Sequence, residues 1–67
     1  MDKNIISKKL INLRGAKNQD EVAKAIGISS SALSMYENGE RIPRDEIKIR
    51  LAEYYDSSVE EIFFNEN

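Results

Sequence analysis

Apolar residues recur along the chain at the spacing of amphipathic helices. Ile6, Leu10 and Leu13 lie at i, i+4 and i+7 and predict a first helix that buries all three and ends at Gly15. A second helix is predicted over residues 19–26, where apolar residues recur at the same spacing. These residues are Val22, Ala23 and Ile26. The first part of the chain is therefore predicted to form two short helices.

A third helix is predicted to start at Ser29, whose side chain can accept a hydrogen bond from the amides of the first turn. Ile28 before it and Leu33 after it hold the two positions of a hydrophobic staple. Gly39 follows the last turn and can take the positive φ that often ends a helix. The connection to the second helix is so short that it permits only a sharp corner. The spacing therefore predicts a helix-turn-helix over about residues 19–38.

The third helix has two different faces. At about 100° per residue, Ala32, Leu33 and Tyr36 fall on one arc, which we predict to be the core side. The opposite arc consists of Ser30, Ser31, Ser34, Met35 and Asn38. Except for Met35, these side chains are short and can donate and accept hydrogen bonds. The thioether of Met35 can contact the outside or can equally fill a half-buried gap. Such a face fits a DNA major groove, where base edges present donors, acceptors and the thymine methyl group.

The last part of the chain carries more apolar residues than one core face can bury. A fourth helix is predicted over residues 45–55, with apolar residues around more than half of its helical wheel. A short fifth helix is predicted after a capping box that begins at Ser58. Phe63 and Phe64 do not share a helix face, so one of them is expected to be exposed. We predict a dimerisation segment over about residues 54–64. Its interface residues are Tyr54, Tyr55, Val59, Ile62, Phe63 and Phe64.

The composition of the 67 residues argues against several classes of protein. The chain has no cysteine and no histidine, so it lacks a disulfide framework, a zinc finger and the commonest general base. The serines of the third helix have no recognisable base, so we predict no catalytic residue and no enzyme. We expect no metal and no cofactor, and no small-molecule ligand is evident. The chain has no long apolar run, so we expect a soluble cytoplasmic protein. Its length predicts one domain, residues 1–67, complete in itself.

The charges are distributed unevenly around a formal net charge of −2. Residues 1–17 carry a net charge of +4, whereas residues 51–67 carry five acidic side chains and no basic one. Salt confines each charge to roughly 10 Å, so DNA responds to the local face of a protein rather than to its total charge. The acidic total predicts modest nonspecific affinity for DNA. Lys8 and Lys9, on the outer side of the first helix, either contact phosphate or form a solvated face.

The central region combines apolar, small and turn residues in one register: Gln19, Val22, Ala23, Ile26, Gly27, Ile28, Leu33, Tyr36, Glu37, Asn38, Gly39 and Pro43. In this register the chain resembles the lambda-repressor-like (Xre/Cro-type) helix-turn-helix regulators over nearly its whole length. The resemblance implies that Ala23 lets the two helices approach, Gly27 makes the turn and Leu33 fills the wedge between them. Two features differ from the family pattern. Residues 13–18 are about two residues shorter than the usual connection, and Asp56 stands where glycine is common.

The resemblance also implies which residues contact DNA. In the family, the glutamine at the position of Gln19 lies where the second helix meets the sugar-phosphate backbone, and free amides favour an anion there. The alternative is that Gln19 is an ordinary first-turn residue. Arg44 is the candidate for phosphate or minor-groove contact, with a solvated loop arginine as the alternative. Glu37 is expected to hold the structure by pairing with a basic residue of the first helix. The predicted base readers are Ser30, Ser31, Ser34 and Met35, with plain surface as the alternative for the three serines. The predicted backbone or minor-groove residues are Lys17, Gln19, Ser29, Asn38, Arg41 and Arg44.

We therefore predict an all-α, five-helix, lambda-repressor-like domain that binds double-stranded DNA as a homodimer. Like the stand-alone prokaryotic and phage regulators that it resembles, it would repress transcription from a palindromic operator. A single recognition helix reads only a few base pairs, whereas two copies on a two-fold axis double that information. The alternative is a protein-interaction module on the same scaffold that does not bind DNA, because a fold alone does not determine function.

Overall fold

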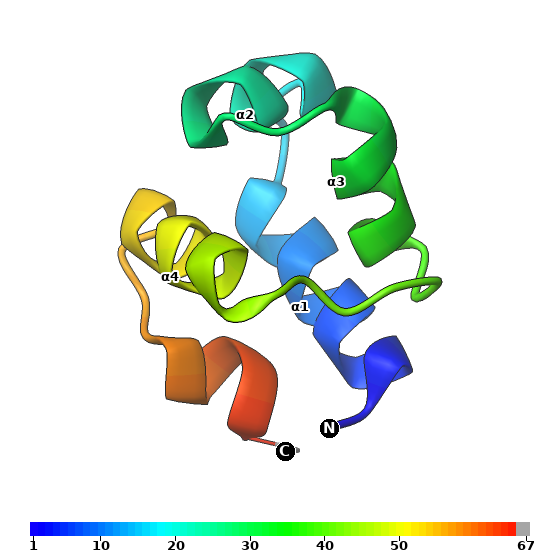
Figure 1. The fold of residues 1–67 in the computed structure, drawn as a ribbon, viewed down its shortest axis with the longest axis vertical. Coiled ribbons are helices and arrows are strands. Elements are labelled where there is room, and N and C mark those ends of the chain that lie inside the picture. Colours follow the sequence, from blue (N-terminus) through cyan, green and yellow to red (C-terminus); the bar gives the residue numbers. More distant parts are fainter. Residues whose placement is uncertain (66–67) are drawn as a thin grey trace.

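The computed structural model describes residues 1–65, which form five helices and no strand (Figure 1). The helices are α1 (Lys3–Arg14), α2 (Gln19–Ile26), α3 (Ser30–Glu37), α4 (Asp45–Tyr54) and η1 (Glu60–Phe64). The predicted all-α, five-helix fold is confirmed, and α4 ends one residue earlier than predicted. α1 contacts α3 and η1, while α2 contacts α3 and α4. None of the described helices is long and apolar enough to cross a membrane.

Side-chain caps fix the start of the first three helices. Asp2 and Asn18 each accept a hydrogen bond from the amide two residues later, at 2.8 and 2.7 Å. The Oγ of Ser29 accepts one from the amide of Ala32 at 3.0 Å, in the predicted capping role. Each bond satisfies one of the first-turn amides that a helix leaves without a partner. Such a cap stabilises a helix by about 1 kcal/mol.

Two glycines make the corners on either side of α3. Gly27 has a φ of +90°, which directs the chain from α2 sharply into α3. A Cβ at this position would lie 3.3 Å from Nη1 of Arg50, so both the backbone angle and the space favour glycine. Gly39 has a φ of +75°, and the amide of Glu40 then donates to the carbonyl of Met35 at 2.9 Å. The corner predicted between α2 and α3 is confirmed.

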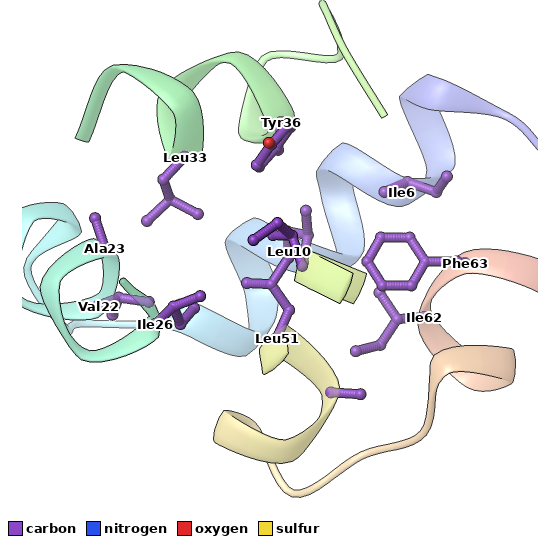
Figure 2. Close-up of a cluster of buried hydrophobic side chains, with 12 residues drawn as sticks. Ile6, Leu10, Val22, Ala23, Ile26, Leu33, Tyr36, Leu51, Ile62 and Phe63 are labelled. Carbon is purple, nitrogen blue, oxygen red and sulfur yellow. The ribbon is translucent and has the colours of Figure 1, made fainter. Parts of the chain in front are cut away.

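The core lies where the five helices meet (Figure 2). Its buried apolar residues are Ile6, Leu10, Val22, Ala23, Ile26, Leu33, Tyr36, Ile47, Leu51, Ala52, Ile62 and Phe63. Each fully buried large side chain contributes about 1.5–3 kcal/mol. Leu13 was predicted to join this core but is 37% exposed, so that prediction was wrong. Leu13 lines an open hollow together with Asn12, Ser57 and Ile62, so it is only partly covered.

The C-terminal segment η1, a single π-helical turn, packs against α1. Ser58 caps its start, because the amide of Glu61 donates to the Ser58 Oγ at 3.0 Å. Ile62 and Phe63 are each 1% exposed, whereas Phe64 is 56% exposed, so Phe63 is the buried member of the adjacent pair. Assigning Ile62 and Phe63 to a dimer interface was therefore wrong. A domain of this size needs such large side chains for its own core.

The turn between α4 and η1 contains a residue with an unusual backbone angle. Asp56 has a φ of +55°, the one positive φ outside glycine within residues 1–65. The amide of Ser57 then donates to the carbonyl of Ala52 at 2.8 Å, which closes the end of α4. Among residues with a side chain, aspartate is one of the few that tolerate this region. The angle explains why glycine is common at this position in the family that the sequence resembles.

Candidate nucleic-acid interface

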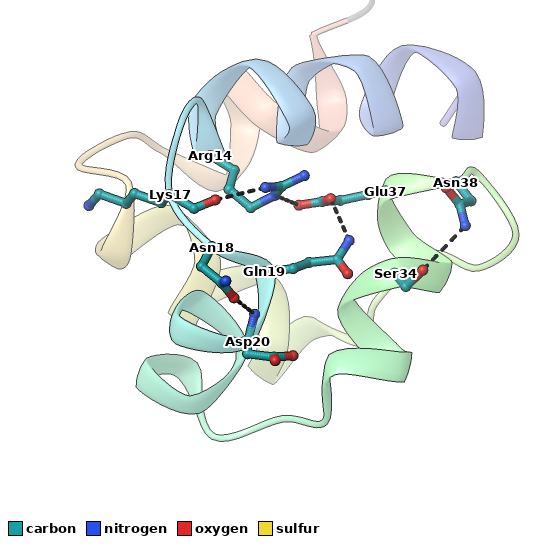
Figure 3. A network of polar contacts seen from close by, with 8 residues as sticks. All are labelled: Arg14, Lys17, Asn18, Gln19, Asp20, Ser34, Glu37 and Asn38. Atoms are coloured by element: carbon teal, nitrogen blue, oxygen red, sulfur yellow. Dashed lines mark hydrogen bonds and ion pairs between the residues drawn. The ribbon is translucent and has the colours of Figure 1, made fainter.

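α3 presents different residues to the core and to solvent. Leu33 and Tyr36 are buried on the side that faces α1 and α2. The four predicted base readers are Ser30, Ser31, Ser34 and Met35, of which Ser31 is exposed and the others are half-buried. Asn38 donates from its side chain to the Oγ of Ser34 at 3.3 Å (Figure 3). The structure thus leaves a row of short polar side chains and one methionine accessible along an eight-residue helix.

Glu37 joins the end of α3 to the two preceding helices (Figure 3). Its side chain is only 2% exposed. Nε of Arg14 donates to Oε2 at 2.8 Å, and Nε2 of Gln19 donates to Oε1 at 2.9 Å. The predicted pairing of Glu37 with a basic residue of the first helix is confirmed. The hydrogen bond to Glu37 raises the pKa of Arg14, and both oxygens of the buried carboxylate have the partners that burial of a charge demands.

Arg14 also holds the short connection between α1 and α2. Its Nη1 donates to the carbonyl of Lys17 at 2.7 Å, while the amide of Lys17 donates to the carbonyl of Arg14 at 3.1 Å. Residues 14–17 are thereby closed into a tight turn. One side chain therefore fixes both the turn that leads into α2 and, through Glu37, the end of α3.

Two predicted phosphate-contacting residues have partners inside the protein. The side chain of Gln19 donates to Glu37, and Nζ of Lys17 lies 4.8 Å from the centre of the Tyr54 ring. A cation over an aromatic face is attracted to the ring's electrons. Gln19 still lies in the first turn of α2, where backbone amides favour an anion. Contact of either residue with DNA remains a prediction.

Arg41 and Arg44 lie on the loop beside α3 and are both exposed. Together with Ser29 they border a hollow of about 390 Å³ between the start of α3 and the start of α4. Apolar residues complete its lining: Ile28, Ala32, Tyr36, Ile42 and Ile47. Arg41 and Arg44 thus supply two guanidinium groups near the N-terminus of α3. The structure therefore brings three of the predicted backbone residues together at one hollow beside α3.

Lys8 and Lys9 differ in their surroundings. Nζ of Lys9 donates to the carbonyl of Glu61 at 2.7 Å and also to the carbonyl of Asn65. Lys9 therefore attaches the C-terminal segment to α1, a role that differs from both of the predicted alternatives. Lys8 is exposed on the outer side of α1.

Two contacts between helices were not predicted from the sequence. Nη1 of Arg50 donates to the carbonyl of Ile26 at 3.2 Å and so caps the end of α2 from α4. The hydroxyl of Ser30 donates to Oδ1 of Asp20 in the first turn of α2. Both contacts join residues on different helices. No local spacing signals such pairs, because they form only when the helices pack.

The geometry of α2, the corner and α3 agrees with comparisons to known proteins. The sequence matches the Helix-turn-helix family over residues 8–62. The chain belongs to the lambda-repressor-like helix-turn-helix family. This helix-turn-helix chain is also similar to the solution structure of the SOS-response transcriptional repressor LexA from Eubacterium rectale, with 30% sequence identity and a TM-score of 0.85. The similarity covers 91% of this chain and 67% of the LexA chain. No curated protein matches the sequence.

The family match and the similarity to a repressor together support a DNA-binding regulator and point away from an enzyme. The matched residues include the whole helix-turn-helix, both loop arginines and the Arg14–Glu37 pair. The helix-turn-helix family places its second helix in the DNA major groove. In this chain that helix is α3, whose accessible face carries the serines and Met35.

Proposed function

We propose that this protein is a sequence-specific transcriptional repressor that binds a near-palindromic operator as a homodimer. The observation that carries the proposal is the accessible polar face of α3, held in place by the Arg14–Glu37–Gln19 contacts. An α-helix fits the major groove, and short hydroxyl side chains can donate to or accept from base edges there. Arg41 and Arg44 would contact the phosphate backbone or the adjacent minor groove, which fixes register without reading sequence.

The proposed dimer sets a requirement on the spacing of its two α3 helices. The Cα trace extends 27 Å along its longest axis. To read two half-sites, a dimer of such chains would need its α3 helices roughly 34 Å apart, one turn of B-DNA. A symmetric dimer would then require half-site centres about 10 base pairs apart.

The proposed self-contact involves the surface around Phe64, which is 56% exposed. The sequence shortly before Phe64 contributes three half-buried residues to this proposed surface: Tyr54, Tyr55 and Val59. The test is sedimentation with and without operator DNA, for the wild type and for Phe64→Glu. The proposal predicts a wild-type dimer on DNA and weaker operator binding by the variant. A wild type that binds a single half-site as a monomer, with an affinity that Phe64→Glu leaves unchanged, would exclude the dimer.

A protein-interaction module is the second candidate function. The net charge of −2 and the exposed side chains of Ile11, Ile49 and Phe64 favour it. Such a module would use these apolar residues to bind a protein and would leave the serine face of α3 without a role.

Salt dependence of binding to duplex DNA separates the two functions. A dimer that uses Lys17, Arg41, Arg44 and first-turn amides would neutralise roughly 4 to 8 phosphates. The logarithm of its binding constant should then fall with the logarithm of salt concentration by about 0.9 for each phosphate. A flat salt response, or no binding to any duplex at low salt, would favour the interaction module.

A further inference from the structure

The contact between Ser30 and Asp20 joins the two helices of the DNA-binding unit across their corner. Ser30 is the first residue of α3, and its hydroxyl donates to a carboxylate oxygen of Asp20, the second residue of α2. Ser30 is half-buried, whereas Asp20 is exposed beside it. Because the acceptor is ionised, this bond is stronger than one between two neutral groups. The contact therefore fixes the direction in which the serine proton points.

A hydroxyl group has one proton to donate and two lone pairs with which to accept. When the proton of Ser30 points to Asp20, the oxygen can only accept from any further partner. In the major groove, adenine N6 and cytosine N4 are donors, whereas guanine O6 and N7 and thymine O4 are acceptors. An oxygen that only accepts can form a hydrogen bond with adenine N6 or cytosine N4. It cannot form one with the acceptors of guanine or thymine, and it repels them.

We propose that Asp20 sets the base preference of Ser30, so that Ser30 selects adenine or cytosine over guanine or thymine on the strand that it faces. The inference rests on the proposed function, because it requires α3 to lie in the major groove. Each base pair has one amino group in that groove, on its adenine or its cytosine. A fixed acceptor therefore distinguishes the two orientations of a pair, but not A·T from C·G. A missing hydrogen bond of this kind costs about fivefold in affinity.

The charge of Asp20 has a separate effect on binding. A carboxylate at the DNA surface repels phosphates whatever the sequence, so removing it raises affinity for all sites alike. The hydrogen bond to Ser30 affects only the one position that Ser30 reads. Glu21 provides the matched control, because it lies in the same turn of α2 and carries the same charge. Among the described residues, the hydroxyl of Ser30 donates to Asp20 and not to Glu21.

The experiment is a selection of bound sequences from random duplex DNA with four proteins, each checked for folding by thermal melting. These are the wild type and the variants Ser30→Ala, Asp20→Ala and Glu21→Ala. The position whose preference disappears in Ser30→Ala is the one that Ser30 reads. We expect the wild type to favour adenine or cytosine there by about fivefold. Asp20→Ala should accept all four bases, and Glu21→Ala should bind more tightly with the wild-type preference intact.

Three results would overturn the inference. A wild type that prefers guanine or thymine at this position contradicts the acceptor role directly, and this outcome does not depend on the folding of the Asp20 variant. An Asp20→Ala protein that keeps the preference for adenine or cytosine shows that Asp20 does not set it. If the wild type and Ser30→Ala select the same sequence, Ser30 reads no base and the inference is refuted, while the proposed DNA binding stands. A wild type that selects no sequence refutes the proposed function itself.

Discussion

Nε of Arg14, the last residue of α1, lies 2.8 Å from Oε2 of Glu37, the last residue of α3. The side chain of Glu37 is almost completely buried, while that of Arg14 is 22% exposed. A buried carboxylate is stable only when its charge is compensated and its oxygens have donors. The pair therefore ties the position of α3 to α1, and the same guanidinium closes the turn before α2.

Arg14→Ala should destabilise the protein by about 2–4 kcal/mol, because it leaves the buried carboxylate of Glu37 without its cation. Adding Glu37→Gln should recover part of this loss, since the neutral amide needs no counter-charge. The free energies of unfolding come from urea titrations of the wild type, both single variants and the double variant. Glu46→Gln is the control, because it removes only the exposed pair with Arg50, which should contribute about 0.2–1 kcal/mol. Strictly additive losses at Arg14 and Glu37 would show that the two residues are not coupled.

Tyr55 should make the protein less stable in alkaline solution. Within residues 1–65 its hydroxyl is buried without a hydrogen-bond partner. Burial, and then the nearby charge of Glu37, raise the pKa of Tyr55 to about 12 from an ordinary value of 10.0. Between these two values the unfolded chain has lost the proton and the folded chain keeps it. The free energy of unfolding therefore falls as pH rises through this window, and below it the group has no effect.

The slope should be at most about 1.4 kcal/mol per pH unit, and less because solvent screens a ring that is only half-buried. Urea unfolding of the wild type and of Tyr55→Phe at about pH 9, 10 and 11 measures this slope. The variant is the control for all other groups that titrate in this range. The variant should lose stability less steeply than the wild type. Equal slopes would mean that Tyr55 ionises as readily in the folded chain as in the unfolded one.

Asp56→Gly should stabilise the fold by about 0.5–1 kcal/mol. The positive φ at this position strains a residue that has a Cβ, and glycine adopts it without that cost. The greater freedom of glycine in the unfolded chain offsets part of the gain. Ser57→Gly is the matched control, because Ser57 has no positive φ and should lose stability. Thermal melting of both variants gives the comparison, and a less stable Asp56→Gly protein would contradict the account.

Ser31 and Arg44 should have separable roles in DNA binding. Ser31→Ala should change the preferred operator sequence, with a loss of about 1–3 kcal/mol at matched sites, because its exposed hydroxyl can reach a base edge. Arg44→Ala should weaken binding to all sites and reduce the salt dependence by about one phosphate. Affinity measurements on the operator and on single-base variants distinguish the effects. The two roles would be reversed if Arg44→Ala changed the central sequence of the preferred operator while Ser31→Ala left it unchanged.

The parts of this structure that the sequence predicts are those that local chemistry determines. Ser29 caps α3 and Gly27 makes the corner, and both follow from the properties of single residues at fixed spacing. Periodicity also indicates which face of a helix is apolar, but not which element covers it. For this reason Leu13 was wrongly predicted to be buried, and Phe63 was wrongly assigned to a dimer surface.

Contacts between helices were predictable only where charge made them necessary. Glu37 required a basic partner, and the first helix supplies Arg14. The contacts of Ser30 with Asp20 and of Lys17 with Tyr54 depend on the angles at which helices pack. The family pattern located Gln19 at the start of α2, but its bond to Glu37 became visible only in three dimensions.

We propose that the chain contacts DNA through α3 and its flanking segments. The most direct test is a titration of the ¹⁵N-labelled protein with a duplex of its selected operator, followed by amide chemical shifts. We expect the largest changes at Ser29–Met35, in the first turn of α2 at Gln19, and in the loop at Arg41–Arg44. An absence of changes at low salt, or changes confined to α4 and η1, would contradict it.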